Sequence, residues 1–160
     1  MPLKKILFLC IGNSCRSQMA EGFARAYGSD VMVARSAGLS PAGRIAPLTY
    51  QTMKERNILL DGQFPKGLDA FPPTERFDLV INLSGHSIPV DLNAPVEEWK
   101  VRDPIGEEPE VYQQVATQLE NLVMTLILRL RREAAARPAP VEKREPIPRG
   151  LGRSLGRSKP

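Results

Sequence analysis

The stretch LKKILFLCIGNSCRSQMAEG, residues 3–22, decides the prediction of the fold. Its apolar run at residues 6–9 does not alternate with polar residues, as expected of a parallel strand covered on both faces. The run ends at Cys10. Residues 17–27 then repeat apolar side chains at helical spacing, and Gly28 suits the end of a helix. The sequence therefore predicts a strand, a tight turn and a helix, with a thiol at the tip of the strand.

Strand-like and helix-like segments continue to alternate along the chain. Such alternation predicts an α/β domain with a mostly parallel sheet, in which ligands bind at the carboxyl ends of the strands. The further segments are strands at residues 31–34, 78–83 and 98–101, helices at 45–56 and 110–132, and a short helix at 66–70.

Composition divides the 160 residues into a domain at residues 1–136 and a tail at 137–160. The tail has seven basic and two acidic residues, a net charge of +5, so residues 1–136 carry −1 of the total of +4. It is rich in Pro and Gly, and a segment of this kind is expected to be a flexible, disordered tail. Its basic LGRS repeats suit an anionic partner, although a solvated tail without a partner is the simpler interpretation.

Several classes of protein are excluded by residue content. The longest apolar runs fall well short of the 18 residues of a membrane span, so a cytoplasmic protein is expected. The chain has two cysteines, Cys10 and Cys15, and one histidine, His86, in no metal-binding spacing. Neither a metal nor another cofactor is therefore expected. At least one thiol is expected to do chemistry in a reducing compartment.

The turn after the first strand has the features of an anion site. Backbone N–H groups of such a turn and the dipole of the following helix attract negative charge. The nucleotide-binding pattern GxxxxGK[ST] is absent, and Cys10 and Arg16 flank the turn instead. An arginine fork matches two oxygens of a tetrahedral anion, and the same positive field favours the thiolate of Cys10. Ser17 can donate a hydrogen bond to that sulfur, and Asn13 tolerates a left-handed backbone.

A thiolate beneath a tetrahedral anion predicts phosphoryl transfer to sulfur. This reaction needs an acid that protonates the leaving oxygen. Asp103, in VRDPIG, is the candidate, because Pro104 stiffens the turn behind it. The simpler interpretation is that Asp103 only caps a turn.

The segments CIGNSCRSQMAEG and SAGLSPAG and the Asp-Pro turn resemble the low-molecular-weight protein tyrosine phosphatase family, which includes thiol-dependent arsenate reductases. The resemblance, over about residues 4–132, implies a single three-layer domain with a four-stranded parallel sheet flanked by helices. It implies Cys10 as nucleophile, Arg16 as oxyanion clamp, Ser17 as thiolate partner and Asp103 as general acid. Cys15 would be the redox partner that traps oxidised Cys10 as a disulfide. The implied phosphate-binding loop comprises Ile11, Gly12, Asn13, Ser14, Cys15, Arg16 and Ser17.

Two activities remain open within this resemblance. SQMAEG and MKERNILLDGQFPKGL resemble the reductase branch, but Ser84 and Ile88 stand where its thioredoxin-coupled members have cysteines. Arsenate reduction would then need an external small thiol. The segment DPIGEEPE lacks the aromatic residues that sandwich a phosphotyrosine ring.

From these residues we expect a phosphomonoester hydrolase acting through a phosphocysteine on a phosphorylated protein or a small phosphomonoester. The first alternative is an arsenate reductase. The second is a non-catalytic module that senses oxyanions or redox state, which would have no need of a general acid.

Overall fold

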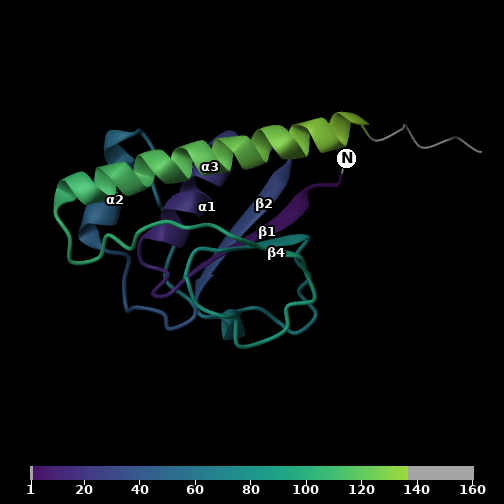
Figure 1. Cartoon of the computed structure of the whole chain (residues 1–160), viewed down its shortest axis with the longest axis horizontal. Coiled ribbons are helices and arrows are strands. Elements are labelled where there is room, and N and C mark those ends of the chain that lie inside the picture. Colours follow the sequence, from purple (N-terminus) through teal and green to yellow (C-terminus); the bar gives the residue numbers. More distant parts are fainter. Residues whose placement is uncertain (1, 137–160) are drawn as a thin grey trace, which may run out of the picture.

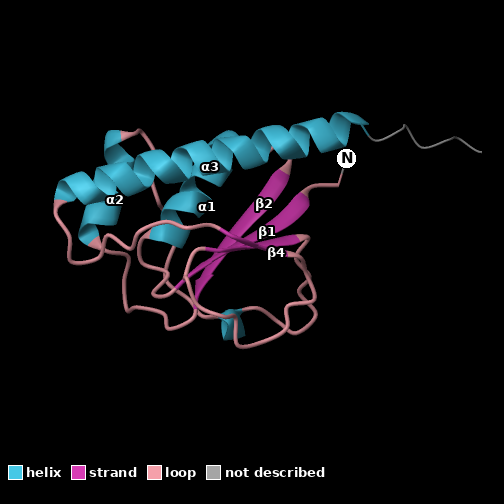
Figure 2. Cartoon of the chain, in the orientation of Figure 1, coloured by secondary structure: helices cyan, strands magenta, loops and turns pink. Residues whose placement is uncertain are grey.

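The computed structural model describes residues 2–136, and its core is a sheet of four parallel strands (Figures 1 and 2). The strands are β1 (Lys4–Cys10), β2 (Met32–Gly38), β3 (Leu79–Asn82) and β4 (Val96–Glu98), in the spatial order β2-β1-β3-β4. Each pair of neighbours is parallel. The predicted α/β class and four-stranded parallel sheet are confirmed.

Strand β1 lies inside the sheet and is buried on both faces. Ile6 and Phe8 pack into the larger core, whereas Leu7 and Leu9 pack into a smaller cluster on the opposite face. All four side chains are fully buried. This two-sided burial explains why the strand reads as an uninterrupted apolar run.

Three helices form the layer on the Ile6 and Phe8 face: α1 (Arg16–Tyr27), α2 (Pro47–Glu55) and α3 (Pro109–Ala136). The long α3 lies across α1 and α2 and buries an apolar stripe against them (Figure 1). In the part of the chain described, the other face is covered by loops and the single-turn 3-10 helix η1 (Leu68–Ala70). The three layers are thus present, with a loop layer on the second face.

Pairing between strands explains where the element bounds differ from the sequence prediction. The fourth strand is found at Val96–Glu98 and not at residues 98–101, because Val96 pairs with Val80 and Glu98 with Asn82. Its three residues are mostly exposed and carry little apolar signal. Similarly, β2 extends to Gly38 because it pairs with β1 along its whole length.

The order of the strands places a crevice beside the end of β1. The chain leaves β1 toward β2 on one side, and β3 joins β1 on the other side. In open α/β sheets, the carboxyl ends of strands at such a switch point form the binding crevice. The loop between β1 and α1 lies there.

The predicted tail at residues 137–160 lies outside the described residues. Among the residues described, no helix is both long and apolar enough to cross a membrane.

Candidate active site

The loop that joins β1 to α1 has its carbonyl groups bonded away from its centre. The carbonyl oxygens of residues 10, 11, 12 and 14 accept hydrogen bonds of 2.8–3.0 Å from backbone N–H groups in residues 39–46. The carbonyl of Asn13 accepts from Gln18 Nε2 at 3.0 Å, and that of Cys15 accepts from the N–H of Met19 at 2.8 Å. All six carbonyls from Cys10 to Cys15 are therefore satisfied by protein donors.

The backbone N–H groups of the same loop differ from its carbonyls in their hydrogen bonding. Within residues 2–136, no N–H of residues 11–17 donates a hydrogen bond to a protein acceptor. Asn13 has φ of 49°, a left-handed conformation that lets one loop turn carbonyls and amides to different sides. A run of unpaired amides at a helix N-terminus can bind a tetrahedral anion.

Gly38, at the end of β2, allows the loop to approach the sheet closely. A Cβ atom at this position would lie 2.7 Å from the carbonyl oxygen of Ile11 and 2.9 Å from the backbone nitrogen of Asn13. Both atoms belong to the backbone and cannot rotate away. The small residue is therefore required by the shape of the loop.

The sulfur of Cys10 is 2% exposed and is linked through Ser17 to Asn13 by two hydrogen bonds. Ser17 Oγ lies 2.8 Å from Cys10 Sγ, and Asn13 Nδ2 donates to Ser17 Oγ at 2.7 Å. Because Ser17 accepts from Asn13, its own hydroxyl hydrogen is free to point to the sulfur. A hydroxyl that donates to sulfur stabilises the thiolate over the thiol.

Arg16 is 5% exposed and lies across the crevice between β1 and β3. Its Nη1 donates to the carbonyl oxygens of Leu83, after β3, and of Val101, after β4, the latter at 3.1 Å. Those bonds fix the plane of the guanidinium. In the described chain no hydrogen bond occupies its Nε, which leaves this N–H to donate to an oxyanion.

Asp103 joins this group from the loop between β4 and α3. Its Oδ2 lies 3.5 Å from Arg16 Nη2, and its Oδ1 accepts the N–H of Ile105 at 3.1 Å. The side chain is 43% exposed, so it can exchange protons with solvent. Asp103 therefore forms a turn with one carboxylate oxygen and faces Arg16 with the other, and its role as general acid stays a prediction.

Cys15 is 2% exposed and is held differently from Cys10. Burial raises the pKa of the Cys15 thiol to about 12, and a hydrogen bond with Thr49 only partly opposes this effect. The thiol is therefore neutral at physiological pH.

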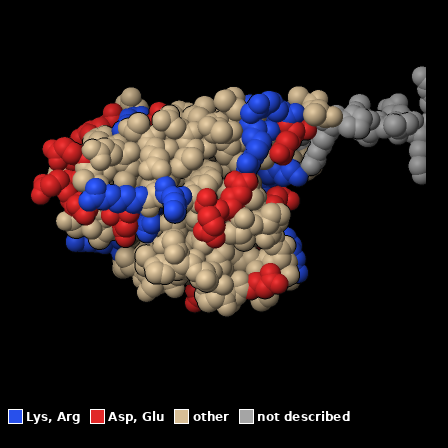
Figure 3. Space-filling model, viewed as in Figure 1, with Lys and Arg blue, Asp and Glu red and all other residues tan. Residues whose placement is uncertain are grey.

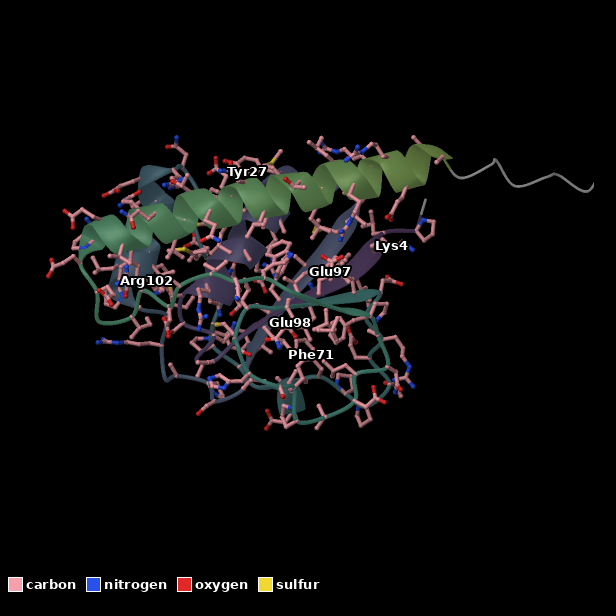
Figure 4. The ribbon with its side chains drawn as sticks, viewed as in Figure 1. Lys4, Tyr27, Phe71, Glu97, Glu98 and Arg102 are labelled. Atoms are coloured by element: carbon pink, nitrogen blue, oxygen red, sulfur yellow. The ribbon has the colours of Figure 1, made fainter. Side chains whose placement is uncertain are left out.

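A cleft of about 710 Å³ opens beside Arg16, between the loop after β3 and the segment after β4. Trp99 lines it and also packs on Phe8, with ring centroids 5.9 Å apart, so this residue serves both core and cleft. Glu98 and Arg102, labelled in Figure 4, lie along the same cleft.

Several polar partners of the site were not foreseen from the sequence. Gln18 and Gln63 extend the hydrogen bonds of Asn13, and Thr49 Oγ1 donates to the carbonyl of Ser14 at 3.0 Å. Their spacing in the sequence carries no signal, because each lies on a different segment of the fold. Among the described residues, no three His, Cys, Asp or Glu side chains gather as a metal site.

Comparison with known proteins agrees with this architecture. The chain is 35% identical over 132 residues to the glutaredoxin arsenate reductase of Synechocystis, covering 80% of this chain and 99% of the relative. It is 37% identical over 120 residues to arsenate reductase 1 of Bacillus cereus, covering 72% of this chain and 88% of that protein. A solved structure described as an arsenate reductase in the phosphate binding state superposes with a TM-score of 0.72 at 34% identity, covering 80% and 99% of the two chains.

The profile of a family described as low molecular weight phosphotyrosine protein phosphatase matches residues 5–136. This match spans nearly all of the described chain, and its relatives retain similar length and fold. The chain belongs to the low molecular weight phosphotyrosine protein phosphatase family.

Proposed function

We propose that the protein is an arsenate reductase that takes its electrons from an external small thiol. The observation that carries this proposal is the loop after Cys10. Its carbonyls at residues 10–15 are bonded elsewhere, while the N–H groups of residues 11–17 have no protein acceptor in the described part of the chain. The similarity to proteins named arsenate reductases supports the reductase over the hydrolase that the sequence alone favoured.

In this proposal, arsenate binds as a tetrahedral anion in the loop. The donors to its oxygens are the N–H groups of residues 11–17, which have no acceptor within residues 2–136, and the Nε of Arg16. These donors are fixed before the anion arrives, so little reorganisation is needed on binding.

The first step forms a bond between Cys10 Sγ and arsenic. The sulfur gives its electron pair to arsenic, and one arsenate oxygen leaves as water after taking a proton from Asp103. Ser17 stabilises the thiolate before the attack. The product is an S–As(V) adduct on Cys10.

The second step is the reduction. An external thiolate attacks Cys10 Sγ, an S–S bond forms, and the pair from the broken S–As bond goes to arsenic. Arsenic(V) becomes arsenic(III), which leaves as arsenite after protonation. A second thiol then attacks the mixed disulfide and releases the Cys10 thiolate. Overall, arsenate and two thiols give arsenite, one disulfide and water.

The absence of thiols after β3 and the cleft beside Arg16 both favour an external reductant. Ser84 and Ile88 occupy the positions at which an internal relay would need thiols. Ser84 Oγ also donates to Asn82 Oδ1 at 2.6 Å, which ties down the loop after β3. The cleft next to Arg16 leaves room for a small thiol beside the start of α1. A reaction that consumes thiols fits a reducing cytoplasm.

Hydrolysis of phosphomonoesters is the second candidate, and the position of Asp103 favours it. The first step is the same with phosphate, and water then attacks the phosphocysteine. Asp103 can supply the proton for the leaving oxygen and later accept one from water.

The surface around the site disfavours acidic phosphopeptides as substrates for such a hydrolase. Glu107, Glu108 and Glu110 are exposed after Asp103, and Figure 3 shows acidic side chains gathered at the end where α3 begins. Ile105, 48% exposed, occupies the place after the Asp-Pro turn where an aromatic ring would stack. Small phosphomonoesters fit this surface better than phosphotyrosine peptides.

The test compares arsenite production and para-nitrophenyl phosphate hydrolysis by the same full chain. Arsenite is quantified by chromatographic speciation with glutathione-type or mycothiol-type small thiols, each with and without glutaredoxin, and with thioredoxin alone. We expect arsenite with a small thiol, none with thioredoxin alone, and no turnover by Cys10→Ser.

Each other outcome selects another function. Phosphate ester turnover without arsenite formation supports the hydrolase and overturns the reductase. Efficient turnover with thioredoxin alone contradicts the inference that Ser84 and Ile88 exclude an internal thiol relay. Phosphate binding without any turnover by the wild type leaves the oxyanion-sensing module as the explanation.

A further inference from the structure

A chain of buried amide side chains connects Gln63 to the sulfur of Cys10. It passes through Gln18, Asn13 and Ser17, and every link is a hydrogen bond of 3.0 Å or shorter. Gln63 belongs to the segment after α2, far from the loop in the sequence. We propose that Gln63 is a positioning residue that keeps the Ser17 hydroxyl directed at the Cys10 thiolate; the proposal rests on Cys10 being the nucleophile.

The first links run in one direction from donor to acceptor. Gln63 Nε2 donates to Gln18 Oε1 at 2.8 Å and to the Gln18 carbonyl at 3.1 Å. With its oxygen fixed in this way, Gln18 turns its Nε2 to Asn13. There it donates to Oδ1 and to the backbone carbonyl, both at 3.0 Å. Each amide therefore sets the orientation of the next.

The final links pass this orientation to the sulfur. The backbone N–H of Lys66, three residues after Gln63, donates to Asn13 Oδ1 at 3.0 Å and supports the same orientation. Asn13 Nδ2 then has Ser17 Oγ as its acceptor at 2.7 Å, and the Ser17 hydrogen is left for Cys10 Sγ. The last donor in the row, the Ser17 hydroxyl, is thus directed at the Cys10 thiolate.

Burial makes the order difficult to reverse. Gln63 is 7% exposed, and Gln18, Asn13 and Ser17 are fully buried. A reversed amide in this row would place oxygen against oxygen at a position buried from bulk solvent. Loss of the Gln63 donor is therefore expected to weaken the hydrogen bond from Ser17 to the Cys10 sulfur.

Two substitutions of Gln63 separate this role from simple packing. Gln63→Glu retains the shape but presents a carboxylate to the oxygens of Gln18, which favours reversal of the whole row. Gln63→Met retains much of the volume and removes the donor. Gln114, exposed on α3, provides matched controls as Gln114→Glu and Gln114→Met.

The readout is the rate of Cys10 alkylation by iodoacetamide as a function of pH, with the site assigned by fragment-ion mass spectrometry. We expect the midpoint of the profile to move up by about one pH unit in both Gln63 variants, which is a roughly tenfold loss of reactivity below the midpoint. The titratable groups that act on Cys15, in the same loop, are Cys10, Arg16 and Asp103, and Tyr112 lies beyond Cys15. All four are unchanged in these variants.

A role in packing alone would lower the melting temperature and leave the midpoint unchanged. Unchanged midpoints in folded Gln63 variants, equal to those of the Gln114 controls, overturn the proposal. If Gln63→Glu does not fold, Gln63→Met alone decides. Alkylation needs neither arsenate nor a phosphate ester, so failure of the proposed function would appear as absent turnover with the shift in midpoint still present.

Discussion

Replacing Asp103 by Asn separates the proposed acid role of this residue from its role in the turn. The amide retains an oxygen that can accept the N–H of Ile105, the bond of 3.1 Å that forms the turn. It removes the ionisable proton and the negative charge 3.5 Å from Arg16 Nη2. The variant is therefore expected to fold and to bind anions while losing catalysis.

The two expected effects differ in size and sign. Loss of a general acid lowers kcat/KM by about 10²–10⁴, which is roughly 3–5 kcal/mol of transition-state stabilisation. The charge interaction with Arg16 is at most about 1 kcal/mol because Asp103 is 43% exposed to water. Its removal leaves more of the positive field for an anion, so phosphate affinity is expected to stay the same or rise by less than about tenfold.

The assay measures kcat/KM on phenyl phosphate and on para-nitrophenyl phosphate, arsenite formation, and phosphate inhibition. The loss should be larger for phenyl phosphate, whose leaving oxygen is the more basic and depends more on protonation. Asp91→Asn is the matched control, since Asp91 Oδ1 accepts the N–H of Asn93 at 2.8 Å in a similar turn. Activities of Asp103→Asn within twofold of the wild type on all substrates would refute the acid role.

Three further predictions concern the loop. Arg16→Lys keeps the charge but loses the fork, so phosphate affinity measured by calorimetry should fall at least about tenfold; unchanged affinity would contradict the clamp. The pKa of Cys15 is raised to about 12, so its thiol is expected to stay protonated through pH 9. Iodoacetamide should therefore label Cys10 alone until denaturant is added. Labelling of Cys15 in the folded protein would show that burial does not protect it. Gly38→Ala should cost roughly 1–3 kcal/mol in the free energy of unfolding by urea, whereas Gly43→Ala, with nothing within 4 Å of the added Cβ, should cost less; equal costs would contradict the close approach.

The sequence predicted the features that local pattern encodes. The apolar run of β1 and the helical spacing of α1 are neighbours in the chain, so the turn between them could be placed from residues 3–22 alone. Cys10 and Ser17 flank one turn at the start of a helix, which is why their contact of 2.8 Å was predictable. The fourth strand was misplaced by two to three residues because its position depends on pairing with β3.

The remaining features depend on contacts between distant segments. Gln63 reaches Gln18 over 45 residues, and Arg16 reaches the Val101 carbonyl over 85 residues. In neither contact do the residue types or their separation in the sequence differ from those of polar residues on an ordinary protein surface. Only the assembled fold brings them to the end of β1.

The outward bonding of the loop carbonyls has a consequence for turnover. Unpaired amides and a guanidinium hold negative charge strongly but give little hold on a neutral molecule. In the proposed reaction, arsenate would enter as an anion, whereas arsenite is uncharged near neutral pH, so the reduction would itself remove the attraction that retains the substrate. A loop of this kind can release a neutral product without the movement of a lid or a hinge. Inorganic phosphate, which keeps its charge, should remain bound and act as a competitive inhibitor.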